Sequence, residues 1–272
     1  MKNIAVVTGA SSGMGREFVL QIAEKYQKLD EIWAIARREE RLQQLQGEAS
    51  LPVRIFPMDL TEKESIKKLM ALLSAENPKL RLLVNSAGCG RIGNFFGSSY
   101  EGNVTMIDLN CRALTAVTYA CLPYMPKKSR ILFLASSASF TPQPGFAVYA
   151  ASKAYVLSFS RALNQELKEK QISVTAVCPG PVETEFFEEA GDSRKMSAIK
   201  KLSMVPPAPV VRRALSDAAK KKELSVYGLP MKGSLLASKL LPHRLLVPAM
   251  DHFLNKDHAK AQDASGNGEE TT

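Results

Sequence analysis

Short apolar segments alternate with longer amphipathic segments along most of the chain, and this alternation limits the fold more than any other feature of the sequence. The apolar segments have the length of strands buried on both faces, whereas the amphipathic segments have the spacing of apolar residues that favours helices. Strands joined through helices lie parallel in a sheet with helices on both faces. The sequence therefore predicts an α/β fold of three layers, α/β/α, around a parallel sheet of about seven strands.

The same pattern places the expected elements along the sequence. The expected strands span residues 4–8, 31–36, 53–57, 80–85, 130–135, 173–177 and 224–227. The expected helices span residues 13–28, 39–45, 62–73, 103–122, 149–169 and 208–222. Because no internal repeat and no Pro/Ser-rich linker interrupts these elements, we expect one domain.

The last third of the chain departs from this alternation. We expect residues 1–256 to form the single domain, in which residues 185–222 form a lid over the site. Residues 233–255 are apolar and interrupted by prolines, and the polar residues 257–272 are expected to be disordered. The apolar segment could lie in a membrane interface or pack against another subunit, and we favour packing.

Charge and composition argue against several other classes of protein. The net charge is +9, but the basic residues are spread out and no basic helix carries interleaved aromatic residues, so we expect no nucleic-acid partner. Neither a signal peptide nor a membrane span is recognisable, and we expect a cytoplasmic protein. We expect no metal site and no disulfide framework from the cysteines and histidines: Cys89, Cys111, Cys121, Cys178, His243, His252 and His258.

A glycine-rich turn, TGASSGMG, follows the first expected strand directly and spans residues 8–15. Gly9, Gly13 and Gly15 permit a tight turn and let a pyrophosphate approach the backbone closely. The helix that starts there offers unpaired N–H groups and the positive end of its dipole to an anion. Because the turn lies between a first strand and a first helix, it predicts a dinucleotide site.

This turn resembles the cofactor loop of the short-chain dehydrogenase/reductase family, in its short single-domain branch. Further motifs in the family's order extend the resemblance over residues 2–184. The resemblance implies a Rossmann-type doubly wound sheet, a nicotinamide cofactor and, as is frequent in the family, a homodimer or homotetramer. It also implies that Ser11, Ser12 and Met14 of the loop contact the cofactor.

Basic residues stand where an NAD-binding unit usually has an acidic residue for the ribose 2′-hydroxyl, at the end of the second strand. These residues are Arg37 and Arg38, and guanidinium groups match a 2′-phosphate that a carboxylate would repel. Arg16 is similar to the basic residue that NADP-using members of the family carry beside the loop. The three arginines together predict NADP as the cofactor.

The resemblance implies further cofactor contacts after the later strands. Asp59 and Leu60 follow the third strand, where the family's acidic residue meets the adenine ring, although Asp59 could instead cap the next helix. The family's N-N-A-G turn is present as Asn85-Ser86-Ala87-Gly88, with serine in the second position. The remaining contacts are expected from the turn after the sixth strand: Pro179, Gly180, Val182 and Thr184.

Tyr149 and Lys153 form a Y-x-x-x-K pattern, which places the two side chains one turn apart on the same helix face. A phenol with a pKa near 10 is a poor base at neutral pH, but a neighbouring ammonium group and an oxidised nicotinamide would favour its ionised form. We therefore expect Tyr149 to act as the general acid or base at a carbonyl or alcohol oxygen. Both residues are also expected to contact the cofactor.

Two more residues complete the catalytic set that the resemblance implies. Ser136 ends the fifth strand thirteen residues before Tyr149, where the family's serine hydrogen-bonds the substrate oxygen. Ser137 is the alternative, but it points to the opposite side if the strand continues. Asn110 matches the helix asparagine of the family, which supports a water relay to the lysine, here Lys153.

The sequence thus predicts an NADP(H)-dependent oxidoreductase that interconverts a ketone or aldehyde and an alcohol. Apolar residues in the expected lid favour a bulky apolar substrate such as a hydroxysteroid or bile acid, and a β-ketoacyl group or a xenobiotic carbonyl fits almost as well. The alternative from another class is a non-catalytic NADP-sensing protein on the same fold. An incomplete Ser/Tyr/Lys set would favour that alternative, and here the set is complete.

Overall fold

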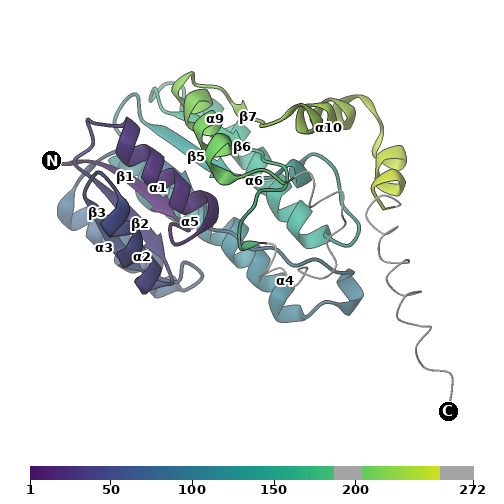
Figure 1. Cartoon of the computed structure of the whole chain (residues 1–272), viewed down its shortest axis with the longest axis horizontal. Coiled ribbons are helices and arrows are strands. Elements are labelled where there is room, and N and C mark those ends of the chain that lie inside the picture. The colour runs from purple at the N-terminus through teal and green to yellow at the C-terminus, as the bar shows by residue number, and fades with distance from the viewer. Residues whose placement is uncertain (187–203, 252–272) are drawn as a thin grey trace, which may run out of the picture.

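Seven parallel strands form one sheet in the computed structural model, which describes residues 1–186 and 204–251 (Figure 1). Their order across the sheet is β3-β2-β1-β4-β5-β6-β7. The strands are β1 Asn3–Thr8, β2 Glu31–Ala36, β3 Val53–Pro57, β4 Lys79–Asn85, β5 Arg130–Leu134, β6 Ser173–Val177 and β7 Leu224–Ser225. The order is that of a doubly wound Rossmann-type fold, so the predicted fold class is confirmed.

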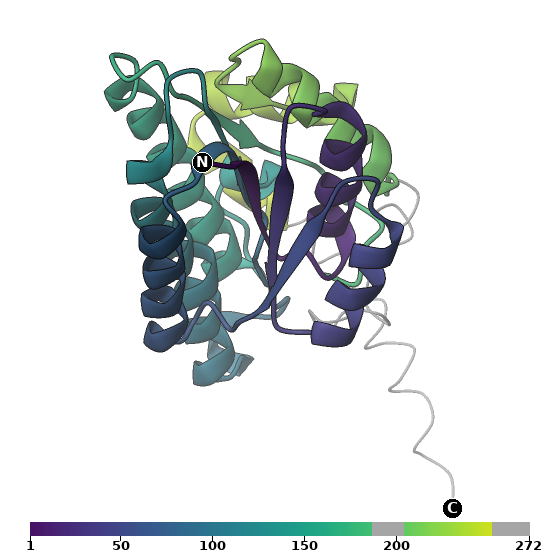
Figure 2. The same cartoon turned by 90° about the vertical axis from the view of Figure 1, so that its left-hand side faces the viewer.

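Helices cover both faces of the sheet, as Figure 2 shows from the side. One face is covered by α1 (Gly13–Lys25), α2 (Glu39–Glu48) and α9 (Pro207–Ala219), and the other by α3 (Lys63–Glu76), α5 (Leu114–Cys121) and α6 (Ala147–Glu166). Each face has its own cluster of buried apolar residues, so the core consists of two layers separated by the sheet. The predicted three-layer architecture is therefore confirmed.

The first strand shows why the sheet needs helices on both sides. Ile4 and Val6 belong to the cluster beneath α3, α5 and α6, whereas Ala5 and Val7 belong to the cluster beneath α1, α2 and α9. All four side chains are fully buried. Because successive side chains of a strand point to opposite faces, a strand buried on both faces has a continuous apolar sequence rather than an alternating one.

The sheet has one point at which its winding direction reverses. The chain proceeds from β1 through β2 to β3 toward one edge, and from β4 to β7 toward the other. β1 and β4 are neighbours, and Thr8 and Asn85 are paired at their carboxyl ends. Loops leave the strands in opposite directions here, which opens a crevice where doubly wound sheets bind their ligands. The site should therefore lie above the ends of β1 and β4.

The helix predicted over residues 103–122 is broken into three parts. Between α4 (Tyr100–Ile107) and α5 lies a π-helical segment, Asp108–Ala113. Such wide turns accommodate an extra residue within a helix and occur frequently at functional sites. The wide turn contains Asn110, whose side chain is fully buried.

The predicted lid, residues 185–222, extends too far along the chain. Val210, Val211 and Leu215 of α9 are buried beneath the sheet, and α9 packs beside α1. This helix is amphipathic because it covers the sheet, and it belongs to the core. The middle of the predicted lid, residues 187–203, lies outside the described residues.

The C-terminal apolar segment begins in α10 (Leu229–Leu240), which projects from the rest of the chain and has no buried residue (Figure 1). A further helix follows at residues 243–251. Within the ranges that the structure describes, no helix has both the length and the apolar character needed to cross a membrane. The predicted tail, residues 257–272, lies outside those ranges.

Candidate active site

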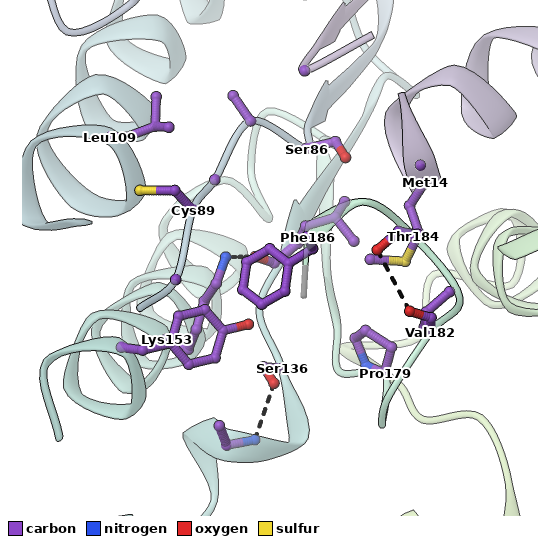
Figure 3. A pocket seen from close by; sticks show the side chains of 18 of the residues that line it. Met14, Ser86, Cys89, Leu109, Ser136, Lys153, Pro179, Val182, Thr184 and Phe186 are labelled. Atoms are coloured by element: carbon purple, nitrogen blue, oxygen red, sulfur yellow. Dashed lines mark hydrogen bonds between the residues drawn. The ribbon is translucent and has the colours of Figure 1, made fainter. Parts of the chain in front are cut away.

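A cavity of about 680 Å³ lies at the carboxyl ends of the strands, within the usual size range of ligand sites. Most of the predicted site residues line it: Gly9, Ser11, Ser12, Gly13, Met14, Gly15, Arg37, Arg38, Asp59, Leu60, Ala87, Gly88, Ser136, Tyr149, Lys153, Pro179, Gly180, Val182 and Thr184. Figure 3 shows side chains from helix α6 and from several loops, among them Lys153, Ser136 and Phe186, around one hollow. The fold thus brings together the phosphate loop and the Y-x-x-x-K pair.

Three predicted residues do not line the cavity. Arg16 forms an ion pair with Glu48 of α2 in this structure, so its contact with the cofactor stays a prediction. The buried amide of Asn85 donates a hydrogen bond to Thr118 Oγ1 at 3.0 Å, which ties β4 to α5. Asn110 lies behind the lining, where it acts through its hydrogen bonds.

The phosphate loop needs its glycines for two separate reasons. Gly9 and Gly13 have positive φ angles, 67° and 52°, in the left-handed region that side chains disfavour. Gly15 has an ordinary backbone angle, but a Cβ atom there would lie 2.1 Å from the carbonyl oxygen of Gly9. A side chain at Gly15 would therefore push the turn apart.

The start of α1 is suited to an anion. Ser12 is the N-cap residue, yet its side chain makes no capping hydrogen bond, and the first turn contains no acidic residue. The Ser12 hydroxyl instead accepts a hydrogen bond from Arg38 Nη2 at 2.7 Å, and Ser11 Oγ accepts weaker ones from the same guanidinium group. Uncapped helix N–H groups, two hydroxyls and a guanidinium group together fit the phosphates of a dinucleotide.

The same corner holds two residues that sequence reasoning missed. Arg41 lies one turn beyond Arg38, and Glu185 follows the predicted contact Thr184. The Glu185 carboxylate accepts a hydrogen bond from Arg38 Nη1 at 2.9 Å and another from Arg41 Nη1. The position of Arg41, one helical turn after Arg37-Arg38, could have predicted its role in the sequence analysis. No neighbouring residue in the sequence predicted the role of Glu185.

The loops after β1, β3 and β4 are fixed by hydrogen bonds of their own. Thr8 Oγ1 accepts hydrogen bonds from the backbone N–H groups of Ser86 and Ala87, each at 3.1 Å. Asp59 accepts hydrogen bonds from the backbone and hydroxyl of Thr61, which hold the pKa of the Asp59 carboxyl below its ordinary value although burial pulls it upward. Asp59 therefore stabilises the loop after β3 and also lines the cavity.

Tyr149 is buried between two aromatic rings. The Phe146 ring stacks on it at a centroid distance of 4.1 Å, and the Phe186 ring lies at 5.4 Å. Burial raises the pKa of Tyr149 to about 12, although a hydrogen bond with Ser136 acts in the opposite direction. Burial outweighs any effect of Lys153 on this pKa, so the support that Lys153 and an oxidised cofactor would give to the ionised phenol stays a prediction. The phenol is protonated at neutral pH.

Lys153 is held at the bottom of the cavity. Its Nζ donates a hydrogen bond to the carbonyl oxygen of Leu134 at 2.8 Å and lies 5.7 Å from the centre of the Tyr149 ring. Burial lowers the pKa of Lys153 to about 8. The ammonium form therefore still predominates at neutral pH, but it titrates much more readily than an ordinary lysine.

Hydrogen bonds behind Lys153 explain the position of Asn110. The Asn110 amide donates to the carbonyl oxygen of Cys89 at 2.9 Å and to Ser152 Oγ at 3.0 Å, and it accepts from the N–H of Cys89 at 2.9 Å. Gly88 has no room for a side chain, since a Cβ there would lie 3.0 Å from Asn110 Oδ1 and 3.2 Å from Lys153 Nζ. The asparagine thus holds the loop after β4 against α6.

Ser136 and the turn after β6 form the remaining wall. Ser136 Oγ accepts a hydrogen bond from the N–H of Ala138 and lies within the reach of Tyr149, whereas the N–H of Ser137 donates to the carbonyl oxygen of Pro179. This geometry favours Ser136 over Ser137 as the residue beside the phenol. The Thr184 side chain lies against the phosphate loop, because a Cβ at Gly13 would be 3.0 Å from Thr184 Cγ2.

Comparison with known proteins identifies the family. The family model described as short chain dehydrogenase matches residues 3–195. The chain belongs to the short-chain dehydrogenase family. It is therefore an oxidoreductase that acts on the CH–OH group of its substrates, as the sequence predicted.

Curated relatives resemble this short-chain dehydrogenase over most of its length. An NADP-dependent 3-hydroxy acid dehydrogenase of Escherichia coli (strain K12) is 35% identical over 187 residues, 67% of this chain and 74% of the relative. Sulfoacetaldehyde reductase 2 of Chromohalobacter salexigens is 34% identical over 213 residues, 73% of this chain and 81% of the relative.

Solved structures confirm the fold of this short-chain dehydrogenase. A short-chain dehydrogenase from Sphingobium yanoikuyae in complex with NADPH has a TM-score of 0.74 at 24% identity and covers 99% of this chain and 98% of its own. One from Burkholderia cenocepacia in complex with NADP has a TM-score of 0.76 at 20% identity, with coverages of 91% and 96%. The cofactors named for these proteins agree with the prediction of NADP.

Proposed function

We propose that this short-chain dehydrogenase uses NADP(H) to interconvert a ketone or aldehyde and a secondary or primary alcohol, with Tyr149 as the general acid and base. The observation that carries the proposal is one cavity that joins an anion-binding helix start, beside Arg38, to the buried phenol of Tyr149. A sensing protein would need only the first of these two features.

The protein's own groups have separable tasks in this reaction. NADPH, when bound, supplies the hydride. Tyr149 donates its phenolic proton to the substrate oxygen, and its raised pKa keeps that proton available at neutral pH. The Ser136 hydroxyl, beside the phenol, orients the same oxygen. Lys153, anchored to the Leu134 carbonyl, holds positive charge beneath the phenol and favours the phenolate left after proton transfer.

Tyr149→Phe tests the chemical part of the proposal. The variant keeps the ring that packs between Phe146 and Phe186 but loses the proton donor. We expect NADPH binding, followed by nicotinamide fluorescence, to stay within about twofold, while turnover falls by about 10²–10⁴-fold. Turnover that survives the substitution would contradict the assigned role, and loss of NADPH binding would show that the ring position itself had changed.

The substrate we propose is a bulky apolar carbonyl compound, such as a hydroxysteroid or bile-acid ketone. Apolar side chains from widely separated parts of the chain line the same cavity as Tyr149: Ile92, Leu109, Phe146, Phe186, Met231 and Met250. A β-ketoacyl group or a xenobiotic carbonyl would use the same wall. NADPH consumption with a panel of steroid, bile-acid, acyl and quinone carbonyls distinguishes these substrates.

One observation favours a second candidate, a small hydroxy acid or another anionic carbonyl compound. Arg91, next to Ile92 in the chain, also lines the cavity that Tyr149 lines. The relatives above are named for a 3-hydroxy acid and for sulfoacetaldehyde, both of which are anionic. If this candidate is correct, Arg91→Ala raises the KM for a carboxylate substrate by roughly tenfold and leaves the KM for a neutral ketone unchanged. Equal effects on both substrates would reject it.

We further propose that the protein assembles as a homodimer or homotetramer. The apolar side chains of α10 support this proposal, since Leu229, Leu236 and Leu240 are each more than half exposed. Exposed apolar surface of this kind marks a contact with a protein or a membrane.

A further inference from the structure

Glu185 lines the cavity at a corner where it meets two arginines. Its carboxylate forms ion pairs with both Arg38, at 2.9 Å, and Arg41. All three side chains are only partly exposed, and Glu185 lines the cavity together with Arg38. Two guanidinium groups therefore hold one carboxylate inside the cofactor site.

The partners of Arg38 define what this corner is built to bind. The guanidinium group that binds Glu185 also donates to Ser12 Oγ, at the uncapped start of α1. Under the proposed function, this is where the 2′-phosphate of NADPH lies, because guanidinium forks bind phosphate and carboxylate oxygens in the same way. The Glu185 carboxylate thus has the position and the charge of a substitute phosphate.

Two anions cannot share these arginines without strong repulsion. We propose that Glu185 competes with the 2′-phosphate for Arg38 and Arg41, so that NADP(H) binds only when this carboxylate leaves both arginines. The inference rests on the proposed function and adds a residue that limits the affinity for the phosphorylated cofactor. A dinucleotide without the 2′-phosphate does not need the arginines and leaves the ion pairs in place.

The protonation state of Glu185 supports this competition. The hydrogen bond from Arg41 holds the pKa of the Glu185 carboxyl below its ordinary value, and Arg38 acts in the same direction against burial. The group is therefore fully charged at neutral pH. The other acidic residue that lines this part of the cavity, Asp59, is engaged by Thr61 instead.

Two small probes isolate the 2′-phosphate from the nicotinamide and from catalysis. These are 2′,5′-ADP and 5′-AMP, with affinities measured by calorimetry on the full chain of the wild type and of Glu185→Gln. We expect the substitution to raise the affinity for 2′,5′-ADP by roughly threefold to tenfold, because binding no longer requires two partly exposed ion pairs to be broken. The affinity for 5′-AMP should not change.

Glu183→Gln is the matched control, because it removes the same charge from an exposed position two residues earlier. We expect it to leave the ratio of the two affinities unchanged. Glu185→Ala serves as a second variant and should change that ratio in the same direction as Glu185→Gln.

The outcomes separate the two proposals. If the wild type prefers 2′,5′-ADP and Glu185→Gln leaves that preference unchanged or reduces it, the competition is overturned while NADP specificity stands. If neither the wild type nor Glu185→Gln prefers 2′,5′-ADP to 5′-AMP, NADP specificity fails and the competition fails with it. If Glu183→Gln raises the affinity for 2′,5′-ADP as much as Glu185→Gln does, the change in net charge alone explains the effect. That result would also reject the inference.

Discussion

Tyr149 and Lys153 are neighbours on α6, yet burial moves their pKa values in opposite directions, to about 12 and about 8. The same physical cause acts on both, because burial disfavours the charged form of each group. The phenol therefore keeps its proton more firmly, and the ammonium group loses its own more easily. The proposed chemistry uses both residues in this apolar site, where burial of the Lys153 ammonium group lowers the stability of the folded state.

Lys153→Met should reveal this loss of stability. Burial lowers the pKa of Lys153 from 10.5 to about 8. Between these pH values the unfolded chain therefore binds more protons than the folded chain. The destabilisation caused by Lys153 consequently decreases as the pH rises from about 8 to 10.5. The free energy of unfolding of the wild type, relative to the variant, should rise by about 3 kcal/mol between pH 7 and pH 10.5. Tyr149 is common to both proteins and cancels from the difference.

Urea unfolding of both proteins at several pH values measures this difference. Lys153→Met should also lose turnover, so a stable but inactive protein is expected. A difference that stays flat over the window would show that Lys153 is not buried as a cation.

Sequence reasoning singled out the proposed catalytic residues because the pattern that contains them is local. Tyr149 and Lys153 are one helical turn apart, and Ser136 ends a strand shortly before them. The ion pair between Arg41 and Glu185 joins residues 144 positions apart and depends on how two loops meet. The ion pair between Arg16 and Glu48 likewise forms only in the folded chain, and nothing near Arg16 in the sequence predicted it.

At the scale of single elements, the phosphate loop makes the sharpest demand on side-chain size. Gly15→Ala should destabilise the protein by about 1–3 kcal/mol, because the added Cβ meets the Gly9 carbonyl oxygen at 2.1 Å. Since the turn must move to admit it, the affinity for NADPH should fall at least roughly tenfold. Urea unfolding and fluorescence titration with NADPH measure the two effects.

Gly47→Ala is the control for this substitution. Gly47 lies in α2, and an added Cβ meets no atom within 4 Å. Alanine is the better helix former, so the variant should be more stable by about 0.5–1 kcal/mol and bind NADPH as before. If both glycine variants behaved alike, steric overlap at Gly15 would not be the cause.

The elements themselves were predicted well where each has its own hydrophobic pattern. The bounds of β2 agree with the prediction over residues 31–36, and all seven strands occur where apolar segments were expected. The chain is helical over residues 103–121 as predicted, but the π-helical turn within it was not predicted, because the apolar pattern continues on both sides of it. α9 was misread as a lid because an amphipathic pattern does not say which surface it covers.

At the scale of the whole molecule, α10 presents three leucines that are each more than half exposed: Leu229, Leu236 and Leu240. If α10 packs against another copy, replacing Leu236 and Leu240 by serine should lower the mass measured by light scattering by half or more. Met70→Ser on α3 provides a control at another exposed apolar position. An unchanged mass, together with loss of binding to anionic liposomes in the variant, would instead indicate a membrane contact.

The π-helical segment Asp108–Ala113 makes the position of Asn110 depend on the number of residues in this segment. Deletion of one residue would let the whole stretch wind as a regular helix, which by itself costs little. Everything before the deletion would, however, turn by about 100° relative to everything after it. Asn110 would then leave Cys89 and Ser152, which hold the loop after β4 against α6. Natural variation in this stretch should therefore appear as substitutions and not as gains or losses of residues.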